Sequence, residues 1–330
     1  MAKVTVIIPN YNHARFLEKR INSVLNQTYQ DFEIIYLDDV STDNSNQVFA
    51  KFAEDKRIRA IYNEVNSGSP FKQWNKGIGE AKGEYVWIAE SDDYADERLL
   101  EKLVAKLDNH PTVGIAYCQS WEIDENDKIL SSMQRWTADL DEQRWQKDFI
   151  NNGKDECSRY LVFKNTIPNA SAVLIRRSVY ERVGGADGTM KLAGDWRLWV
   201  NILLTSDIAF VSEPLNYFRT LVGGVRSTTS GKNGLRIEES CEIIRYIVET
   251  AGVSKDILEE VCEQTVNWWV EWILYYHHYN VLPNSTNYRV YQTLSEIDSR
   301  INNRFSKNVV KVFGRKLRPR TRLVELLGRS

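Results

Sequence analysis

Three carboxylates stand within four residues at Glu90-Ser91-Asp92-Asp93, directly after an apolar run from Tyr85 to Ala89. Charges of one sign this close repel one another, so the cluster is costly unless water, a cation or a ligand offsets the repulsion. A divalent cation bound by these oxygens would relieve the repulsion and could also hold phosphate groups. The alternative is that Asp92, Asp93 and Asp96 cap the helix that follows, because acids favour helix N-termini.

A second acidic pair, Asp38-Asp39, also follows an apolar run. Both clusters must be positioned by the elements around them, which are β-rich runs that alternate with helical patterns. This alternation predicts an α/β fold with a mostly parallel sheet and helices on both faces. We predict strands at 4–9, 32–39, 58–64, 84–93, 114–124, 171–177 and 207–220. Ligands of open α/β sheets bind at the carboxyl ends of the strands. Both acidic clusters fall at such ends.

The pattern of predicted strands and helices divides the 330 residues into two parts. Residues 1–230 carry the strand and helix alternation, and residues 231–330 read as a helical C-terminal extension, with the boundary in the small, polar stretch VGGVRSTTSGKNG. The four cysteines are widely spaced, which disfavours a thiolate metal site or a disulfide framework. We expect a cytoplasmic protein, because the N-terminus lacks a signal-peptide pattern and no 18-residue apolar run exists.

Common nucleotide-binding motifs are missing from the sequence. A dinucleotide fold needs GxGxxG directly after a strand, but the first strand is followed by Asn10-Tyr11-Asn12-His13. The P-loop pattern GxxxxGK[ST] is also missing. With these two motifs excluded, the remaining interpretation is a nucleotide site formed by a loop without glycine, together with a metal.

Five segments, in this order, resemble the inverting family 2 glycosyltransferases of the GT-A fold: VTVIIPNYNHARFLEKRINSVLNQTY, DFEIIYLDDVSTDNS, NKGIGEAKGEYVWIAESDDYADERLL, SAVLIRRSVYERVGG and AGDWRLWVNI. The resemblance covers roughly residues 3–220. It implies transfer of a sugar from a nucleotide-diphosphate donor, with UDP preferred and dTDP second, to a hydroxyl of a glycan or lipid-linked acceptor in surface polysaccharide synthesis. It also implies a divalent cation, Mn²⁺ or Mg²⁺.

The resemblance implies a role for each matching residue. Asp195 would be the general base; Asp92 and Asp93 would hold the metal, with Asp92 also near the ribose; and the nucleotide would contact Pro9, Asn10, Tyr11, Asp39, Lys72, Asn75 and Asp92. Three of these residues also have a purely structural alternative. Tyr11 could simply pack in the wall of the pocket, Asp39 could be a turn residue, and Asp195 could be the N-cap of its helix.

Three positions depart from the family pattern. Glu90 stands where an Asp is common, Trp74 where an arginine is common, and Leu221 where many relatives have a histidine. These departures leave a third metal ligand undefined. They also keep open a non-catalytic nucleotide-sugar binding module. A sugar-nucleotide pyrophosphorylase is another alternative, although the first loop lacks a glycine-rich, basic phosphate cradle.

The last 31 residues, 300–330, carry ten Lys or Arg and one acid, Glu325. Within a basic amphipathic segment at about 289–330, one helical face gathers Ile301, Phe305, Val309, Val312, Phe313 and Leu317. This pattern predicts either peripheral binding to an anionic membrane surface or a helix whose apolar face packs on the body. Aromatic residues are too few there for nucleic-acid binding, and we expect none.

Overall fold

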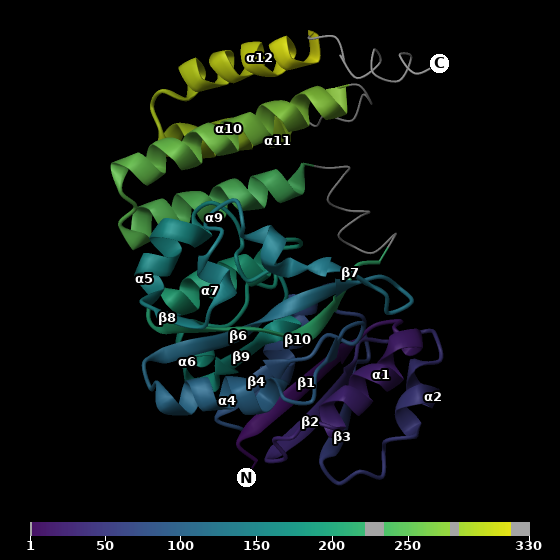
Figure 1. Ribbon diagram of the computed structural model, residues 1–330. Helices are drawn as coiled ribbons and strands as arrows, with labels where there is room; N and C mark the ends of the chain where they lie inside the picture. Colours follow the sequence, from purple (N-terminus) through teal and green to yellow (C-terminus); the bar gives the residue numbers. More distant parts are fainter. Residues whose placement is uncertain (1, 222–233, 278–283, 318–330) are drawn as a thin grey trace, which may run out of the picture.

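The computed structural model describes residues 2–221, 234–277 and 284–317, with the side chains of 274–277, 284 and 312–317 outside the description. The chain forms an α/β body with a stack of helices over one side of it (Figure 1). The predicted domain boundary at 222–235 falls largely outside the described residues. No helix in the described ranges is both long and apolar enough to cross a membrane.

One mixed sheet forms the centre of the body, with the strand order β3-β2-β1-β4-β9-β6-β10-β5. The strands β1, β2, β3 and β4 are mutually parallel, as are β6 and β10, whereas β9 runs antiparallel between β4 and β6. The bounds are β1 (Val4–Asn10), β2 (Phe32–Asp38), β3 (Ile58–Tyr62), β4 (Tyr85–Ile88), β5 (Tyr94–Ala95), β6 (Val113–Ile123), β7 (Ile129–Ser132), β8 (Phe149–Asn151), β9 (Val173–Arg176) and β10 (Asp207–Arg219). The predicted strand at 84–93 is shorter than expected, because the chain leaves the sheet before its acids.

Helices cover both faces of the sheet, as the alternation of the strand residues requires. Ile7 and Ile35 point to one face and Ile8 and Ile34 to the other, and each set belongs to a separate hydrophobic core. The helices are α1 (Ala14–Leu25), α2 (Ser45–Ala50), α3 (Pro70–Gly79), α4 (Leu99–Asn109), α5 (Gly153–Glu156), α6 (Arg177–Arg182), α7 (Gly194–Leu203), α9 (Leu235–Ala251), α10 (Lys255–His277), α11 (Asn284–Ile297) and α12 (Ile301–Leu317). This architecture confirms the predicted α/β class with a flanked sheet.

The described residues of the C-terminal extension form four helices, α9 to α12 (Figure 1). They enclose a small core of their own that includes Ile237, Val266, Trp269 and Leu294. Helix α9 also packs against the body, because Ile243, Ile244 and Ile247 belong to the same hydrophobic core as residues of α3 and α7. The extension and the body are therefore joined through α9 by continuous apolar packing.

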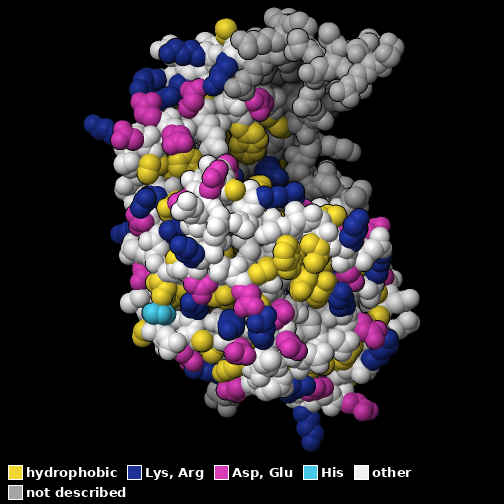
Figure 2. Space-filling view, in the orientation of Figure 1, with side chains coloured by type: hydrophobic (Ala, Val, Ile, Leu, Met, Phe, Trp, Pro, Cys, Tyr) yellow, Lys and Arg dark blue, Asp and Glu magenta, His cyan; other side chains and the backbone are white. Residues whose placement is uncertain are grey.

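The apolar face of α12 packs against its neighbours over the part whose side chains are described. Ile301 is buried, and Phe305 and Val309 pack on the core of the extension, with Phe305 4.9 Å from the Trp269 ring. Acidic and basic side chains are interspersed over the visible part of the extension (Figure 2). These contacts favour the packing interpretation for 301–309, whereas the predicted membrane-binding residues from 318 onward lie outside the described residues.

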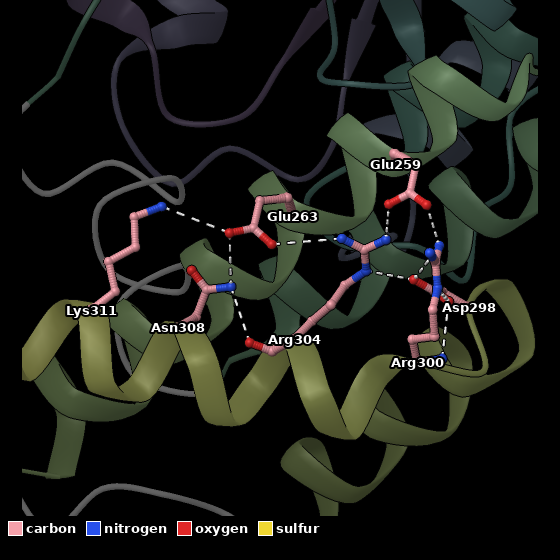
Figure 3. A network of polar contacts seen from close by, with 7 residues as sticks. All are labelled: Glu259, Glu263, Asp298, Arg300, Arg304, Asn308 and Lys311. Atoms are coloured by element: carbon pink, nitrogen blue, oxygen red, sulfur yellow. Dashed lines mark hydrogen bonds and ion pairs between the residues drawn. The ribbon is translucent and has the colours of Figure 1, made fainter.

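A polar network fastens α12 to α10 (Figure 3). Arg304 donates to Asp298 at 2.5 Å and pairs with Glu259, while Arg300 also pairs with both acids. Burial alone would raise the pKa of Asp298, but the Arg300 backbone N–H and the two guanidinium groups lower it to about 2. The basic residues at the start of this helix are thus neutralised within the fold.

We expect Asp298→Asn to lower the free energy of unfolding by about 1–2 kcal/mol at pH 7. The folded pKa lies below the unfolded value of 3.8, so the stabilisation is present above about pH 4 and is lost as the pH falls toward 2. Urea unfolding between pH 2 and 7 measures this, with exposed Glu260→Gln as the control. Equal acid sensitivity of wild type and Asp298→Asn would contradict it.

Candidate active site

The carboxyl ends of β1 and β2 form the first wall of the candidate site. Asn10 is buried and donates to Tyr36, Asp38 and Ser41 at 3.0–3.2 Å, which ties the two strand ends together. The ring of Tyr11, the next residue, is 49% exposed. An exposed aromatic face beside a rigid strand end is suited to stack on a planar base. Pro9 is buried in β1 behind it.

Asp39 lies in the turn that follows β2 and is 4% exposed. Its carboxylate accepts hydrogen bonds from Asn63, Gln73 and both the backbone N–H and the hydroxyl of Ser67. In this state Asp39 organises the turn, and a base would have to exchange with one of these donors. The next residue, Val40, has a φ of 64°. A β-branched side chain in the left-handed region is strained, and such strain gathers at functional sites.

The turn after β4 separates its acids. Asp93 faces inward with 3% exposure, where its Oδ1 accepts the Arg219 backbone N–H at 2.8 Å. Asp92 is partly exposed, and among the described residues its carboxylate has no hydrogen-bond partner. Burial and the neighbouring Asp92 charge raise the pKa of Asp93. Of the two predicted metal ligands, the structure therefore presents Asp92 outward and uses Asp93 to fasten the turn to β10.

Two of the departures from the family pattern meet each other in space. The indole N–H of Trp74 donates to Glu90 Oε1 at 2.7 Å. Burial, then the Asp92 charge, raises the pKa of Glu90 to about 8. Glu90 is held in place by Trp74 from α3 and by its own backbone N–H, which donates to Ser171 Oγ at 3.2 Å.

Two buried arginines, which the sequence analysis did not predict, lie behind the acids. Arg20 on α1 is fully buried and donates from Nε to the Glu90 carbonyl at 2.8 Å. Burial lowers its pKa to about 10, and the three acids partly offset this effect. Arg219 donates to the Asp92 carbonyl at 2.6 Å. The available signal was an arginine at position 20 on the same helical face as Leu17, Ile21 and Val24.

The residues of the acidic turn fit a divalent cation if a bound substrate and water supply the rest of its oxygen ligands. In the described ranges, no three His, Cys, Asp or Glu side chains gather as a complete protein cage. Mg²⁺ sites commonly use only one or two carboxylates and take their other oxygens from water and substrate phosphates. Asp92, with Glu90 beside it, offers such hard oxygen ligands in a cluster whose negative charges are only partly offset.

Asp195 lies in the first turn of α7 and is partly exposed. Its Oδ1 accepts the backbone N–H of Trp196 at 2.8 Å, and its Oδ2 accepts the amide of Asn165 at 3.0 Å. Asn165 is itself fixed, since its carbonyl accepts the Trp136 indole N–H at 2.7 Å. The Asp195 carboxylate therefore has a defined orientation, which a base requires.

Helix α3 connects the acidic turn to the loop of Asp195. Trp74 bonds Glu90, and its neighbour Phe71 packs face-on against Gly194, where an added Cβ would lie 2.6 Å from the ring. The Phe71 and Trp74 rings are themselves 5.0 Å apart. One aromatic pair thus spans the space between Glu90 and the residue before Asp195.

The remaining predicted residues on α3 have different surroundings. Asn75 donates to the Ala186 carbonyl at 2.7 Å and accepts the Tyr180 hydroxyl and the Ala186 N–H. Both amide atoms hold this turn, so a nucleotide contact of Asn75, which stays a prediction, would require exchange with one of these partners. Lys72 is exposed and its stem lies beside Gly188; its ammonium group donates a long hydrogen bond to the Ser67 carbonyl at 3.5 Å, which a phosphate would have to replace.

Two of the hollows among the described residues lie near the elements of the site or at the far end of the sheet. A narrow one is lined by residues that include Trp136, Ile167 and Asn169, close in sequence to Asn165. A wider one lies at the opposite end of the sheet, beside Val179, Leu203 and Asp207. Neither is lined by Asp39, Asp92 or Asp195, so the acids of the candidate site lie outside both hollows.

The ionised form of Glu90 should destabilise the protein when no metal is present. Its folded pKa of about 8 exceeds the model-peptide value of 4.5, so stability falls as the pH rises through that window. We expect Glu90→Gln, which keeps an acceptor for Trp74, to raise the melting temperature at pH 8 but not at pH 5. Thermal unfolding in chelator checks this, with exposed Glu54→Gln as the control. A gain of the same size at both pH values would rule out this origin.

The sequence model of the family described as "Glycosyl transferase family 2" matches residues 5–184. This range holds the strand-end turns of Asp39 and Asp92 and more than half of the chain. The chain therefore belongs to glycosyltransferase family 2.

Individual relatives agree with this assignment. An uncharacterized glycosyltransferase of Nostoc sp. is 32% identical over 225 residues, which are 66% of this chain and 64% of the relative. The glycosyltransferase GlyG of Streptococcus pneumoniae is 29% identical over 68% of this chain and 73% of its own length. The poly(ribitol-phosphate) β-N-acetylglucosaminyltransferase TarS of Staphylococcus aureus is 34% identical over 112 residues, 33% of this chain and 20% of TarS.

Solved structures share the fold. A TarS fragment in complex with UDP-GlcNAc superposes with a TM-score of 0.67 at 17% identity, covering 93% of this chain and 89% of the fragment. A mannosyltransferase of Pyrobaculum calidifontis, in complex with GDP-Man and Mn²⁺, gives 0.57 at 16% identity over 97% of this chain and 88% of that one. At such identities the likeness concerns the fold.

Proposed function

We propose that this chain is an inverting, metal-assisted glycosyltransferase that moves a sugar from a UDP-linked donor to a hydroxyl of a glycan or lipid-linked acceptor. The observation that carries the proposal is the arrangement at the strand ends. Tyr11 and Asp39 offer a base pocket, Asp92 offers free carboxylate oxygens, and Asp195 lies across the aromatic pair of α3 with its carboxylate oriented.

In this proposal each side chain has a separate task. Tyr11 stacks on the base, Asp39 exchanges one of its present donors for the base, and Lys72 faces the diphosphate. Asp195 takes the proton from the acceptor hydroxyl as that oxygen attacks the anomeric carbon, and a single displacement inverts the configuration. A divalent cation held by Asp92 and Glu90, when bound, stabilises the charge that develops on the leaving diphosphate.

The nature of the donor and acceptor rests on the relatives. The TarS fragment binds UDP-GlcNAc, and the name of TarS states transfer to poly(ribitol-phosphate). A uridine diphosphate donor and a surface polymer or its lipid-linked precursor are therefore the substrates that we propose first. The bound GDP-Man of the Pyrobaculum calidifontis mannosyltransferase makes other bases a necessary comparison.

A product assay tests the proposal. The purified chain, Mn²⁺ or Mg²⁺, and a panel of UDP, dTDP and GDP sugars are incubated with glycan acceptors, and the released nucleotide is identified. We expect nucleoside diphosphate to appear only with acceptor and metal. Pyrophosphate formation would instead indicate a pyrophosphorylase, and nucleotide-sugar binding without turnover would indicate a binding module. Either outcome would refute the proposal.

A further inference from the structure

The loop that leads into α7 is held by a residue from the C-terminal extension. Glu239, on α9, is 6% exposed, and its carboxylate accepts three successive backbone N–H groups. The donors are Lys191 at 2.8 Å, Leu192 at 3.0 Å and Ala193 at 2.8 Å. The next two residues are Gly194 and Asp195.

Helix α7 has no side-chain cap at its N-cap position. Its N-cap position is Ala193, which has no side-chain hydrogen-bonding group. Helix N-termini leave backbone donors unsatisfied and favour a nearby negative charge. Glu239 satisfies donors just before this helix from a position 46 residues later in the chain.

Glu239 is itself rigidly placed. Ile243, Ile244 and Ile247, on the same helix, are buried in the core shared with α7. The Arg197 guanidinium of α7 lies 3.5 Å from the centre of the Tyr246 ring of α9. A side chain anchored this firmly can fix the backbone that it contacts.

We infer that Glu239 is a positioning residue for Asp195, so that α9 of the extension is part of the catalytic unit. This inference rests on the proposed function. Asn165 orients the Asp195 carboxylate from the body, whereas Glu239 sets the path of the backbone that carries it. A displacement of about 1 Å at a reacting group can cost about 100-fold in rate.

The test compares Glu239→Ala, Glu239→Gln and the matched control Glu238→Gln in the full chain. Glu238 is the preceding residue of α9, but its carboxylate pairs with Arg289 on α11. We expect Glu239→Ala to lower kcat about 10- to 100-fold while the affinity for UDP with Mn²⁺ stays within about twofold. Glu239→Gln, which keeps one carbonyl acceptor, should recover part of kcat. Glu238→Gln should retain wild-type kcat.

Two further measurements separate positioning from general stability. In an Asp195→Asn background, Glu239→Ala should have little additional effect on the residual rate, because residues that act as a unit are not additive. Amide hydrogen exchange at 191–193 should accelerate in Glu239→Ala and not in Glu238→Gln, whether or not the enzyme turns over.

Three outcomes would overturn the inference. One is equal loss of kcat and UDP affinity in Glu239→Ala, and another is full additivity with Asp195→Asn. The third is unchanged exchange at 191–193. Wild-type transfer by the single variant Asp195→Asn would be a different failure, because it would remove the proposed base and with it the inference.

Discussion

Replacement of Asp195 by Asn should reduce transfer by about 10²–10⁴-fold, the range typical of a lost general base. Asn keeps the shape of the side chain and one of the two oxygen acceptors that Asn165 Nδ2 and the Trp196 N–H use, but it cannot take a proton. The affinity for UDP with Mn²⁺ should stay within about twofold, since Asp195 lies across the aromatic pair of α3 from the acidic turn.

Initial rates at saturating donor and acceptor, together with calorimetric UDP titration, measure the two effects. Asp148→Asn is the control, because this exposed acid bonds Ser212 and Lys106 away from the strand ends. A rate within tenfold of wild type, or a loss of UDP affinity as large as the loss of rate, would show that Asp195 is not the base.

Replacement of Asp92 by Asn should weaken Mn²⁺-dependent UDP binding by at least about tenfold, since a neutral amide is a poor ligand for a hard cation. UDP binding in chelator should change little, because Tyr11 and Asp39 remain. The melting temperature of the metal-free protein should not fall, because the Asp92 carboxylate has no hydrogen-bond partner among the described residues.

Asp93→Ala gives the contrasting result. Removal of its carboxylate leaves the buried Arg219 N–H unpaired, which should lower the free energy of unfolding by about 1–3 kcal/mol. Asp96→Asn is a further control, since Asp96 lies past the turn and pairs with Arg98. If Asp92→Asn and Asp93→Ala have the same effects on metal dependence and stability, the two acids do not have separate roles.

The extension shows how far pattern alone reaches. Periodicity predicted a helical face with Ile301, Phe305 and Val309 within a segment at about 289–330, and the structure has helices at Asn284–Ile297 and Ile301–Leu317. The same pattern suits a membrane surface or a neighbouring helix, and only the packing against Trp269 and the ion pairs of Arg304 decide for the neighbour over this part. An amphipathic sequence specifies that a face must be covered, but it does not specify by what.

The sequence by itself determined seven strands of the body, though not the short strands β5, β7 and β8, and it determined the acids that follow β2 and β4. It also determined the family, because these features depend on local period and on motifs a few residues long. Only the tertiary structure decided that Asp93 turns inward while Asp92 stays outward, and that Trp74 and Glu90 bond each other. It alone showed that Arg20 lies beneath the acids and that Glu239 holds the loop of Asp195. The partners in these contacts are 16 to 126 residues apart. The packing of the helices on the sheet therefore determines which side chains contact each other, and the local sequence pattern does not predict these contacts.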